Sequence, residues 1–158
     1  MSLQSDERSL PGPPLIGALL RIPWEEVHRR LLDGLHAAGF TDLHAAHLSV
    51  LLYPGPDGLR PSDLAAQRQT SRQAMNYLLG QVEELGYIER RADPADQRAR
   101  RIALTPRGRK AGQVMRDTTD ELEREWSRAL GQARFDELKA SLAELAALVE
   151  RDGRVPRG

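Results

Sequence analysis

The stretch that decides the fold runs from Asp93 to Arg109 and reads DPADQRARRIALTPRGR. Its first half is rich in turn-forming aspartate and proline, and residues 100–104 after it indicate a short strand. A matching strand is expected at 87–91, so the two would form a β-hairpin with residues 92–99 as a long, charged tip. The pair Thr105-Pro106 then predicts a helix start, because threonine caps helices and proline favours their first position.

Two short helices are predicted just before this hairpin, at 61–67 and 71–85. Only residues 68–70 separate them, which is typical of a helix-turn-helix. Thr70 or Ser71 is expected to cap the second helix, and Gly86 to end it. A hairpin directly after the second helix is a wing, and a winged helix-turn-helix binds DNA with its second helix in the major groove.

The sequence before this motif predicts two further helices. Apolar residues recur at helical spacing over 15–38, where Pro23 predicts a kink or a new helix start and Gly39 predicts an end. Residues 42–52 predict a shorter helix with Asp42 as its N-cap.

Two long helices are expected after the hairpin. One runs to about Leu130, where Gly131 breaks it, and the other covers about 134–150. The expected fold class is therefore mainly α with a small β-hairpin: a winged helix-turn-helix with N- and C-terminal dimerisation helices. The expected organisation is a flexible arm at 1–14, a domain at 15–151 divided into 15–52, 59–104 and 105–151, and a flexible tail at 152–158.

The charge of the chain is balanced overall but unevenly placed. Its 158 residues include 23 basic and 23 acidic ones, which does not by itself indicate a nucleic-acid binder. Between Arg60 and Lys110, however, there are eleven basic and six acidic residues, a net charge of +5. The rest of the chain has twelve basic and seventeen acidic residues, a net charge of −5. The sequence thus predicts a basic DNA-reading segment on an acidic scaffold.

The predicted helix 71–85 has its apolar side chains on one face, which leaves polar side chains outward near its N-terminal half. Arginine can bind guanine through two hydrogen bonds, and glutamine or asparagine can bind adenine in the same way. The residues expected to read base edges are Ser71, Arg72, Gln73, Asn76 and Tyr77.

Residues 62–110 resemble the winged-helix core of the MarR family of bacterial transcriptional regulators. The family pattern in the wing is D-x-x-D-x-R, then a short apolar strand, then L-T-x-x-G. The stretch 82–90, VEELGYIER, also fits the family, and flanking helices of suitable length extend the resemblance to about 15–150. At Gln97 the chain departs from a common variant that has arginine there. The positions that fit the wing pattern are Asp93, Asp96, Arg98, Leu104, Thr105 and Gly108.

The resemblance implies a homodimeric, sequence-specific transcriptional regulator, a repressor in the expected case, on a near-palindromic operator. It implies that Arg98 enters the minor groove and that Asp96 orients the Arg98 guanidinium through a bidentate pair. The residues expected to contact double-stranded DNA are Ser62, Arg68, Thr70, Ser71, Arg72, Gln73, Asn76, Tyr77, Arg91, Arg98 and Arg100. The residues expected at the dimer interface are Leu15, Leu19, Leu122, Trp126, Leu138, Leu142, Leu145 and Val149.

The resemblance also implies a small-molecule effector. Many members of the family bind small aromatic or phenolic acids between the dimerisation helices and the winged lobe. Such a ligand would relieve DNA binding in the expected case. The candidate lining residues here are Trp24, His28, His47 and Tyr53.

Two alternatives stay open. A metal-responsive regulator of the same fold would use His44 and His47, three residues apart on one helix, with nearby carboxylates. A winged-helix protein-interaction module without DNA binding is the other, and the concentrated arginines count against it.

Other classes of protein are not indicated. No enzyme activity, cofactor or metal is expected, because no phosphate loop or nucleophile set is recognisable and the chain has no cysteine. Neither a signal peptide nor a membrane span is evident, so a cytoplasmic protein without a membrane partner is expected.

Overall fold

The computed structural model describes residues 13–51, 58, 60–67 and 70–153. Within these ranges the chain forms six helices and one two-stranded antiparallel hairpin, which confirms the predicted fold class. In chain order the elements are α1 (Ile16–Ala37), α2 (Ala45–Leu51), α3 (Pro61–Gln67), α4 (Arg72–Glu84), β1 (Ile88–Asp93), β2 (Asp96–Leu104), α5 (Pro106–Leu130) and α6 (Gln132–Gly153).

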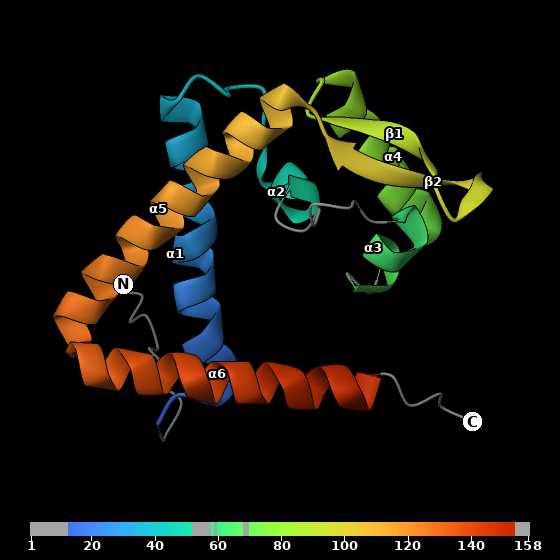
Figure 1. Ribbon diagram of the computed structural model, residues 1–158. Coiled ribbons are helices and arrows are strands. Elements are labelled where there is room, and N and C mark those ends of the chain that lie inside the picture. The colour runs from blue at the N-terminus through green and yellow to red at the C-terminus, as the bar shows by residue number, and fades with distance from the viewer. Residues whose placement is uncertain (1–12, 52–57, 59, 68–69, 154–158) are drawn as a thin grey trace, which may run out of the picture.

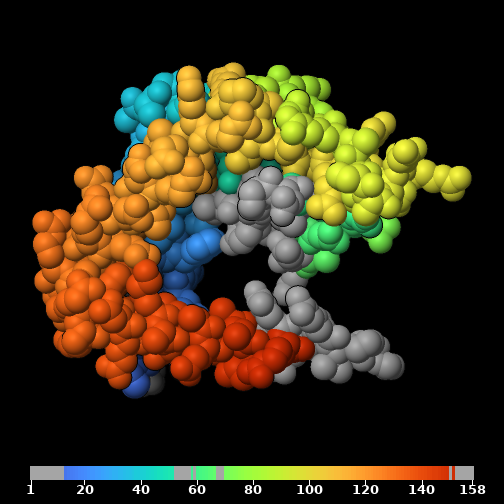
Figure 2. Space-filling model, in the orientation of Figure 1, coloured from blue at the N-terminus to red at the C-terminus, as the bar shows by residue number. Residues whose placement is uncertain are grey.

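Figure 1 shows two parts joined by α5. Helices α2, α3 and α4 gather with the hairpin into one part, which we call the winged lobe. The long helix α5 leaves the end of β2 and packs along α1. Gly131, with φ of 89°, ends α5, and α6 then turns back from its far end. We call α1, α5 and α6 the helical scaffold, and Figure 2 shows an open hollow between α6 and the winged lobe.

The core lies where α1, α2, α4 and the hairpin meet the first half of α5. Leu35 of α1, Leu79 of α4 and Tyr87 before β1 are fully buried there. Burying a leucine side chain contributes about 1.5–3 kcal/mol, so a few such residues from each element hold the lobe on the scaffold.

Helix ends follow the sequence closely. The Ser71 hydroxyl accepts a hydrogen bond from the Ala74 N–H at 3.1 Å, and the Thr105 hydroxyl accepts one from the Gly108 N–H at 3.0 Å. These bonds confirm Ser71 and Thr105 as N-caps. Gly86 has φ of 79°, a left-handed conformation that glycine adopts without strain, and it ends α4 as predicted.

Two details of the N-terminal helices refine or correct the prediction. Helix α1 runs through Pro23, so of the two predicted alternatives the new helix start is absent and the kink stays a prediction. An ion pair of 2.9 Å between Arg21 and Glu25 spans that position and supports the turn from which proline removes a hydrogen bond. Asp42 is not the N-cap of α2, which begins at Ala45. Its carboxylate accepts hydrogen bonds from Tyr87 and Arg107 instead.

The long hairpin tip predicted at 92–99 is wrong. The strands pair as far as Asp93 and Asp96, so that only Pro94 and Ala95 form the turn. The Asp93 carboxylate accepts a hydrogen bond from the Ala95 N–H at 2.9 Å and lies 3.1 Å from the Arg101 guanidinium on β2. Asp93 therefore closes a tight turn and holds the charged segment of β2 in the strand.

Candidate nucleic-acid interface

Helix α4 presents a polar face to solvent. Met75, Leu79 and Val82 are buried, so the residues on the other side of the helix face outward. Tyr77 retains 72% of its surface, an unusual exposure for an aromatic side chain, and its hydroxyl accepts a hydrogen bond from Gln81 at 3.3 Å. Exposed on and before this face are the predicted base-reading residues Ser71, Arg72, Gln73, Asn76 and Tyr77.

The remaining predicted DNA contacts of the helix-turn-helix lie around the start of α4. Ser62 on α3 and Thr70 before α4 are exposed. Ser71 already uses its hydroxyl as the cap of α4. Arg68 lies outside the described residues.

The wing is built around a buried carboxylate. Asp93 is 1% exposed and lies 2.7 Å from the Arg60 guanidinium and 3.1 Å from that of Arg101. The Ala95 N–H and the two arginines lower the pKa of Asp93 to about 2, against the opposing effect of burial. Arg60 precedes α3, so this carboxylate ties the hairpin to the helix-turn-helix.

The sequence did not predict that Asp93 forms ion pairs with Arg60 and Arg101. Asp93 was expected only as a turn former within the wing pattern, and Arg60 and Arg101 only as members of a basic segment. Nothing in the spacing of a single sequence brings position 60 beside position 93. The available signal was an aspartate at the end of a strand in an arginine-rich segment, where a partly buried pair is common.

The outer wing carries arginines with different surroundings. Arg91 pairs with Glu89, and Arg90 pairs with Glu83 of α4 at 3.1 Å. Arg98 and Arg100 are exposed, lie two positions apart on β2 and so extend from the same side of the strand. Among the described residues, neither of these two side chains takes part in an ion pair.

The expected pair between Asp96 and the Arg98 guanidinium is not formed. The Asp96 carboxylate accepts a hydrogen bond from the Arg98 backbone N–H at 3.0 Å instead. A short aspartate next to a two-residue turn binds the backbone ahead of it more readily than a side chain two positions along a strand. Asp96 thus shapes the turn and does not hold the Arg98 guanidinium.

The candidate ligand residues are only partly brought together. The rings of Trp24 and His28 meet edge to face on α1 at 4.1 Å. His47 of α2 is buried, and its ring accepts a hydrogen bond from the His44 N–H at 3.1 Å. Burial and the neighbouring His44 lower the pKa of His47, which favours the neutral ring. Tyr53 lies outside the described residues.

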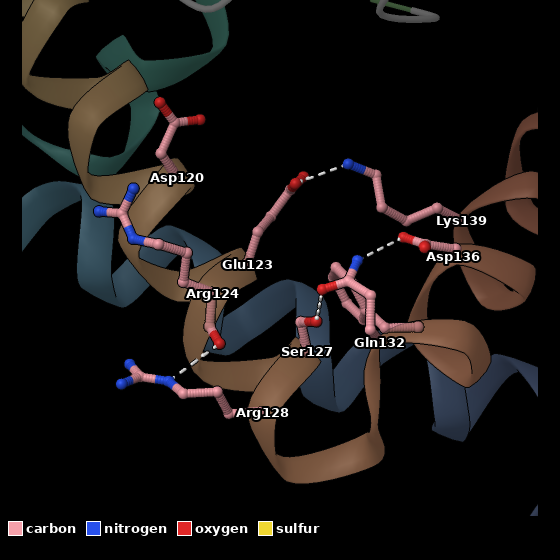
Figure 3. Close-up of a pocket in the computed structure, with 9 residues that line it drawn as sticks. Asp120, Glu123, Arg124, Ser127, Arg128, Gln132, Asp136 and Lys139 are labelled. Atoms are coloured by element: carbon pink, nitrogen blue, oxygen red, sulfur yellow. Dashed lines mark hydrogen bonds and ion pairs between the residues drawn. The ribbon is translucent and has the colours of Figure 1, made fainter.

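Two cavities on the described part of the chain stand out, and neither of these is lined by Trp24, His28 or His47. The larger, of about 630 Å³, lies between α5 and α6, and most of the residues that line it are charged or polar. Figure 3 shows a Lys139–Glu123 ion pair reaching across it from α6 to α5. The smaller, of about 220 Å³, is lined by Leu51, Leu104, Gly112, Met115, Arg116, Thr119 and Asp120.

The predicted interface residues fall into three groups by burial. Leu122 is buried within its own chain, so it supports the scaffold and offers no surface to a partner. Trp126 is half-buried. The others are large apolar side chains exposed on or beside α1 and α6: Leu15, Leu19, Leu138, Leu142, Leu145 and Val149.

The described residues were also searched for a metal site and for a membrane-spanning helix. Among them, no three histidine, aspartate or glutamate side chains are grouped so that they could hold a metal ion. No helix in the described ranges is both long and apolar enough to cross a membrane.

Comparison with known proteins extends this description. Residues 38–99 match the MarR family. No curated protein matches the chain. The transcriptional repressor CouR bound to a 23-mer DNA duplex is 25% identical, with a TM-score of 0.65 over 84% of this chain and 92% of that one.

Two other solved structures have the same fold. The MepR–DNA complex of S. aureus is 24% identical, with a TM-score of 0.66 over 85% of this chain and 98% of that one. CouR from Rhodococcus jostii RHA1, bound to p-coumaroyl-CoA, is 23% identical, with a TM-score of 0.65 over 83% and 91% of the two chains. The chain therefore has the winged helix fold of MarR-family transcriptional regulators, and its residues 38–99 match that family directly.

Proposed function

We propose that the chain is a homodimeric, sequence-specific DNA-binding regulator that represses transcription from a near-palindromic operator. One observation carries the proposal. The same lobe has an exposed polar face on α4 and two exposed wing arginines, Arg98 and Arg100, that form no ion pair within the described part of the chain. In such a dimer the two α4 helices enter successive major grooves about 34 Å apart, and the wing arginines reach the flanking minor grooves.

The solved relatives support this role. CouR is described as a transcriptional repressor and was solved on a DNA duplex, and MepR was solved with DNA. Both are similar to this chain over more than four fifths of its length. Repression follows when the operator overlaps a promoter, because a bound dimer then competes with the polymerase.

The apolar side chains of α1 and α6 support a homodimer. Leu19 remains 49% exposed and Leu142 39% exposed, and both belong to longer apolar rows. A monomer rarely exposes contiguous apolar patches of this kind, and a second copy offers matching rows in a symmetric interface. Dimerisation also supplies the second α4 that a palindromic operator needs.

A small-molecule effector is the second element of the proposal. The smaller cavity lies between the end of α2, the end of β2 and α5, which is where the winged lobe meets the scaffold. Its lining combines apolar Leu51 and Met115 with the cation of Arg116, and the Asp120 carboxylate lies in the same lining. A small aromatic acid that places its ring on the apolar residues and its carboxylate on Arg116 fits this combination. A ligand there would favour a lobe spacing that no longer fits two major grooves.

The test is to select genomic DNA fragments with the full-length protein and to measure their affinity at several salt concentrations. We expect one palindromic sequence to be enriched and its affinity to fall steeply as salt rises, because arginines displace counterions from phosphates. If no fragment is retained at low salt, the chain is a winged-helix protein-interaction module and the proposal fails. A panel of small aromatic acids added to the complex tests the effector separately.

A further inference from the structure

Three side chains from separate segments meet at the junction of the winged lobe and the scaffold. Asp42 lies between α1 and α2, Tyr87 lies between α4 and β1, and Arg107 lies in the first turn of α5. The Tyr87 hydroxyl donates to Asp42 at 2.5 Å, and the Arg107 guanidinium donates to the other Asp42 oxygen at 2.8 Å. Arg107 also stacks over the Tyr87 ring at 4.4 Å. We call these three residues the Asp42 clasp.

The clasp is joined to the last turn of α4. Arg107 donates a second hydrogen bond to the Leu85 carbonyl at 2.9 Å, and the Thr105 hydroxyl donates to the Gly86 carbonyl at 2.6 Å. A β-carbon at position 108 would lie 2.0 Å from the Tyr87 carbonyl, so only glycine allows this close approach. The start of α5 is thus fastened to the C-terminal end of α4.

The titration properties of the clasp are consistent with a permanent ionic contact. Burial acts to raise the pKa of Asp42, but the Tyr87 hydroxyl and the Arg107 charge outweigh it, and the net pKa is lowered. Burial and the bond to Asp42 raise the pKa of Tyr87 to about 12. The carboxylate therefore stays ionised and the phenol stays protonated at neutral pH.

The surroundings of the clasp argue for a role beyond overall stability. The Asp42 and Arg107 side chains are 33% and 46% exposed, and an ion pair in that setting adds at most about 1 kcal/mol to folding. Its geometry is nevertheless specific, since both Asp42 oxygens and two guanidinium nitrogens are used. Such a contact constrains the angle between helices more than it stabilises the fold.

We propose that Asp42, Tyr87 and Arg107 are positioning residues that fix α4 relative to α1 and α5, so that scaffold movements reach the DNA-reading helix through this clasp. The inference rests on the proposed DNA-binding function. None of the three residues needs to touch DNA. Their effect is to hold α4 in one orientation, so that its polar face arrives preorganised at the bases.

The experiment uses full-length Tyr87→Phe and Asp42→Asn variants, with Glu125→Gln as the matched control. Glu125 forms a 2.7 Å ion pair with Arg30 between α1 and α5, which is exposed like the clasp but belongs to the scaffold alone. Hydrogen exchange of the Leu85, Gly86 and Tyr87 amides reports on the last turn of α4 without any DNA. Fluorescence anisotropy compares a selected genomic fragment with a scrambled duplex of the same length.

We expect amide exchange at the end of α4 to quicken by about tenfold in both variants, with the control unchanged. We expect affinity for the selected fragment to fall by about tenfold while affinity for the scrambled duplex stays within about twofold, since phosphate contacts persist. Unchanged exchange overturns the inference, and so does a parallel increase in exchange throughout the fold. Equal weakening on both duplexes, or faster exchange without weaker selective binding, also overturns it.

The two proposals fail in different ways. If the wild-type protein retains no genomic fragment, the proposed function is lost while the exchange measurement still decides whether the clasp holds α4. Tyr87→Phe leaves the Asp42–Arg107 ion pair in place and is the milder change, so it keeps the test informative if Asp42→Asn folds poorly.

Discussion

Asp93 supports the wing with a single buried carboxylate. Asparagine at this position removes the charge that faces Arg60 and Arg101 but preserves the shape, so we expect Asp93→Asn to lower Tm by several degrees at pH 7. The neighbouring Asp96→Asn is the control, because Asp96 is exposed and binds only a backbone N–H. Thermal unfolding of both variants measures the difference.

The stabilisation by the Asp93 carboxylate should weaken as the pH falls. The pKa of Asp93 is about 2 in the folded chain against an ordinary value of 3.8, so its ionised form stabilises the fold. This contribution is complete above about pH 5 and is lost as the pH falls through about 4 toward 2. We expect the Tm difference between wild type and Asp93→Asn to shrink over that range. A difference that stays constant down to pH 2 would contradict the assignment.

Arg98 is the wing residue on which DNA affinity should depend most. We expect Arg98→Ala to weaken binding to all sequences and to reduce the salt slope by about 1, which is the signature of one lost phosphate-region contact. Arg91→Ala should have a smaller effect, because Arg91 is already paired with Glu89. Anisotropy titrations at several salt concentrations test this, and equal slopes for wild type and Arg98→Ala would refute the wing assignment.

At the residue level, sequence patterns predicted which side chains are exposed better than they predicted which side chains contact one another. The periodicity of 71–85 correctly placed Arg72 and Asn76 on the outer face of α4, because burial follows helical spacing. The contacts of Asp42 with Tyr87 and Arg107, and of Asp93 with Arg60, could not be predicted, because these partners lie at distant positions in the chain. Local sequence patterns therefore predicted Asp42 only as a helix cap and Asp93 only as a turn former.

Among the helices, the α1–α5 crossing depends on Gly34. A β-carbon there would lie 2.6 Å from the Thr118 hydroxyl, which is held by a 2.8 Å bond to the Val114 carbonyl. Overpacking of this kind costs about 1–3 kcal/mol, and alanine recovers up to about 1 kcal/mol of helix propensity. We expect Gly34→Ala to lower the free energy of unfolding by about 1–2 kcal/mol in urea denaturation.

Two further variants make the Gly34 prediction specific. Gly80→Ala places a methyl group in mid-helix with no atom within 4 Å, so it should be neutral or stabilising. Adding Thr118→Ala to Gly34→Ala removes the clash and should restore most of the loss. If the double variant is no more stable than Gly34→Ala, the crossing contact is not the cause.

Helices and strands were predicted well where the signals were local. Ser71, Thr105, Gly86 and Gly131 mark boundaries through their own hydrogen bonds and backbone angles, so the ends of α4 and α5 followed from the sequence. The two strands were predicted too short and the tip too long, because the strand ends at Asp93 and Asp96 are held by contacts of the Asp93 carboxylate that strand propensity does not show. Local patterns therefore located the elements, while long-range contacts set the shape of the wing.

In the whole molecule, the net charge is zero, but the positive and negative charges are unevenly distributed along the chain. Residues 60–110, which include the basic start of α5, carry the positive excess and the rest of the chain carries the negative one. In the proposed function, this distribution steers DNA toward the basic segment. The sequence could establish this distribution because it depends only on where charges lie along the chain. The geometry of the proposed dimer would depend on surfaces from both ends of the chain, which no local pattern specifies.

Assembly is the property that the exposed apolar rows should control. Leu142 lies in the row of α6 that continues through Leu145 and Val149, and it is not needed for the core of a single chain. We expect Leu142→Glu to give a folded monomer at concentrations where the wild type is a dimer, as measured by sedimentation velocity. The same variant should lose most of its operator affinity, because one lobe reads only half of a palindrome.

The control for assembly is Ala140→Glu, which adds the same charge on the opposite side of α6. Because that side lacks the leucine row, the variant should remain dimeric and bind the operator as the wild type does. Circular dichroism of both variants excludes a general loss of helix. If Leu142→Glu stays dimeric, α6 is not part of the interface, and two lobes on one operator would require another contact surface. The apolar row of α1 is then the next surface to test, with Leu19→Glu as the matching change.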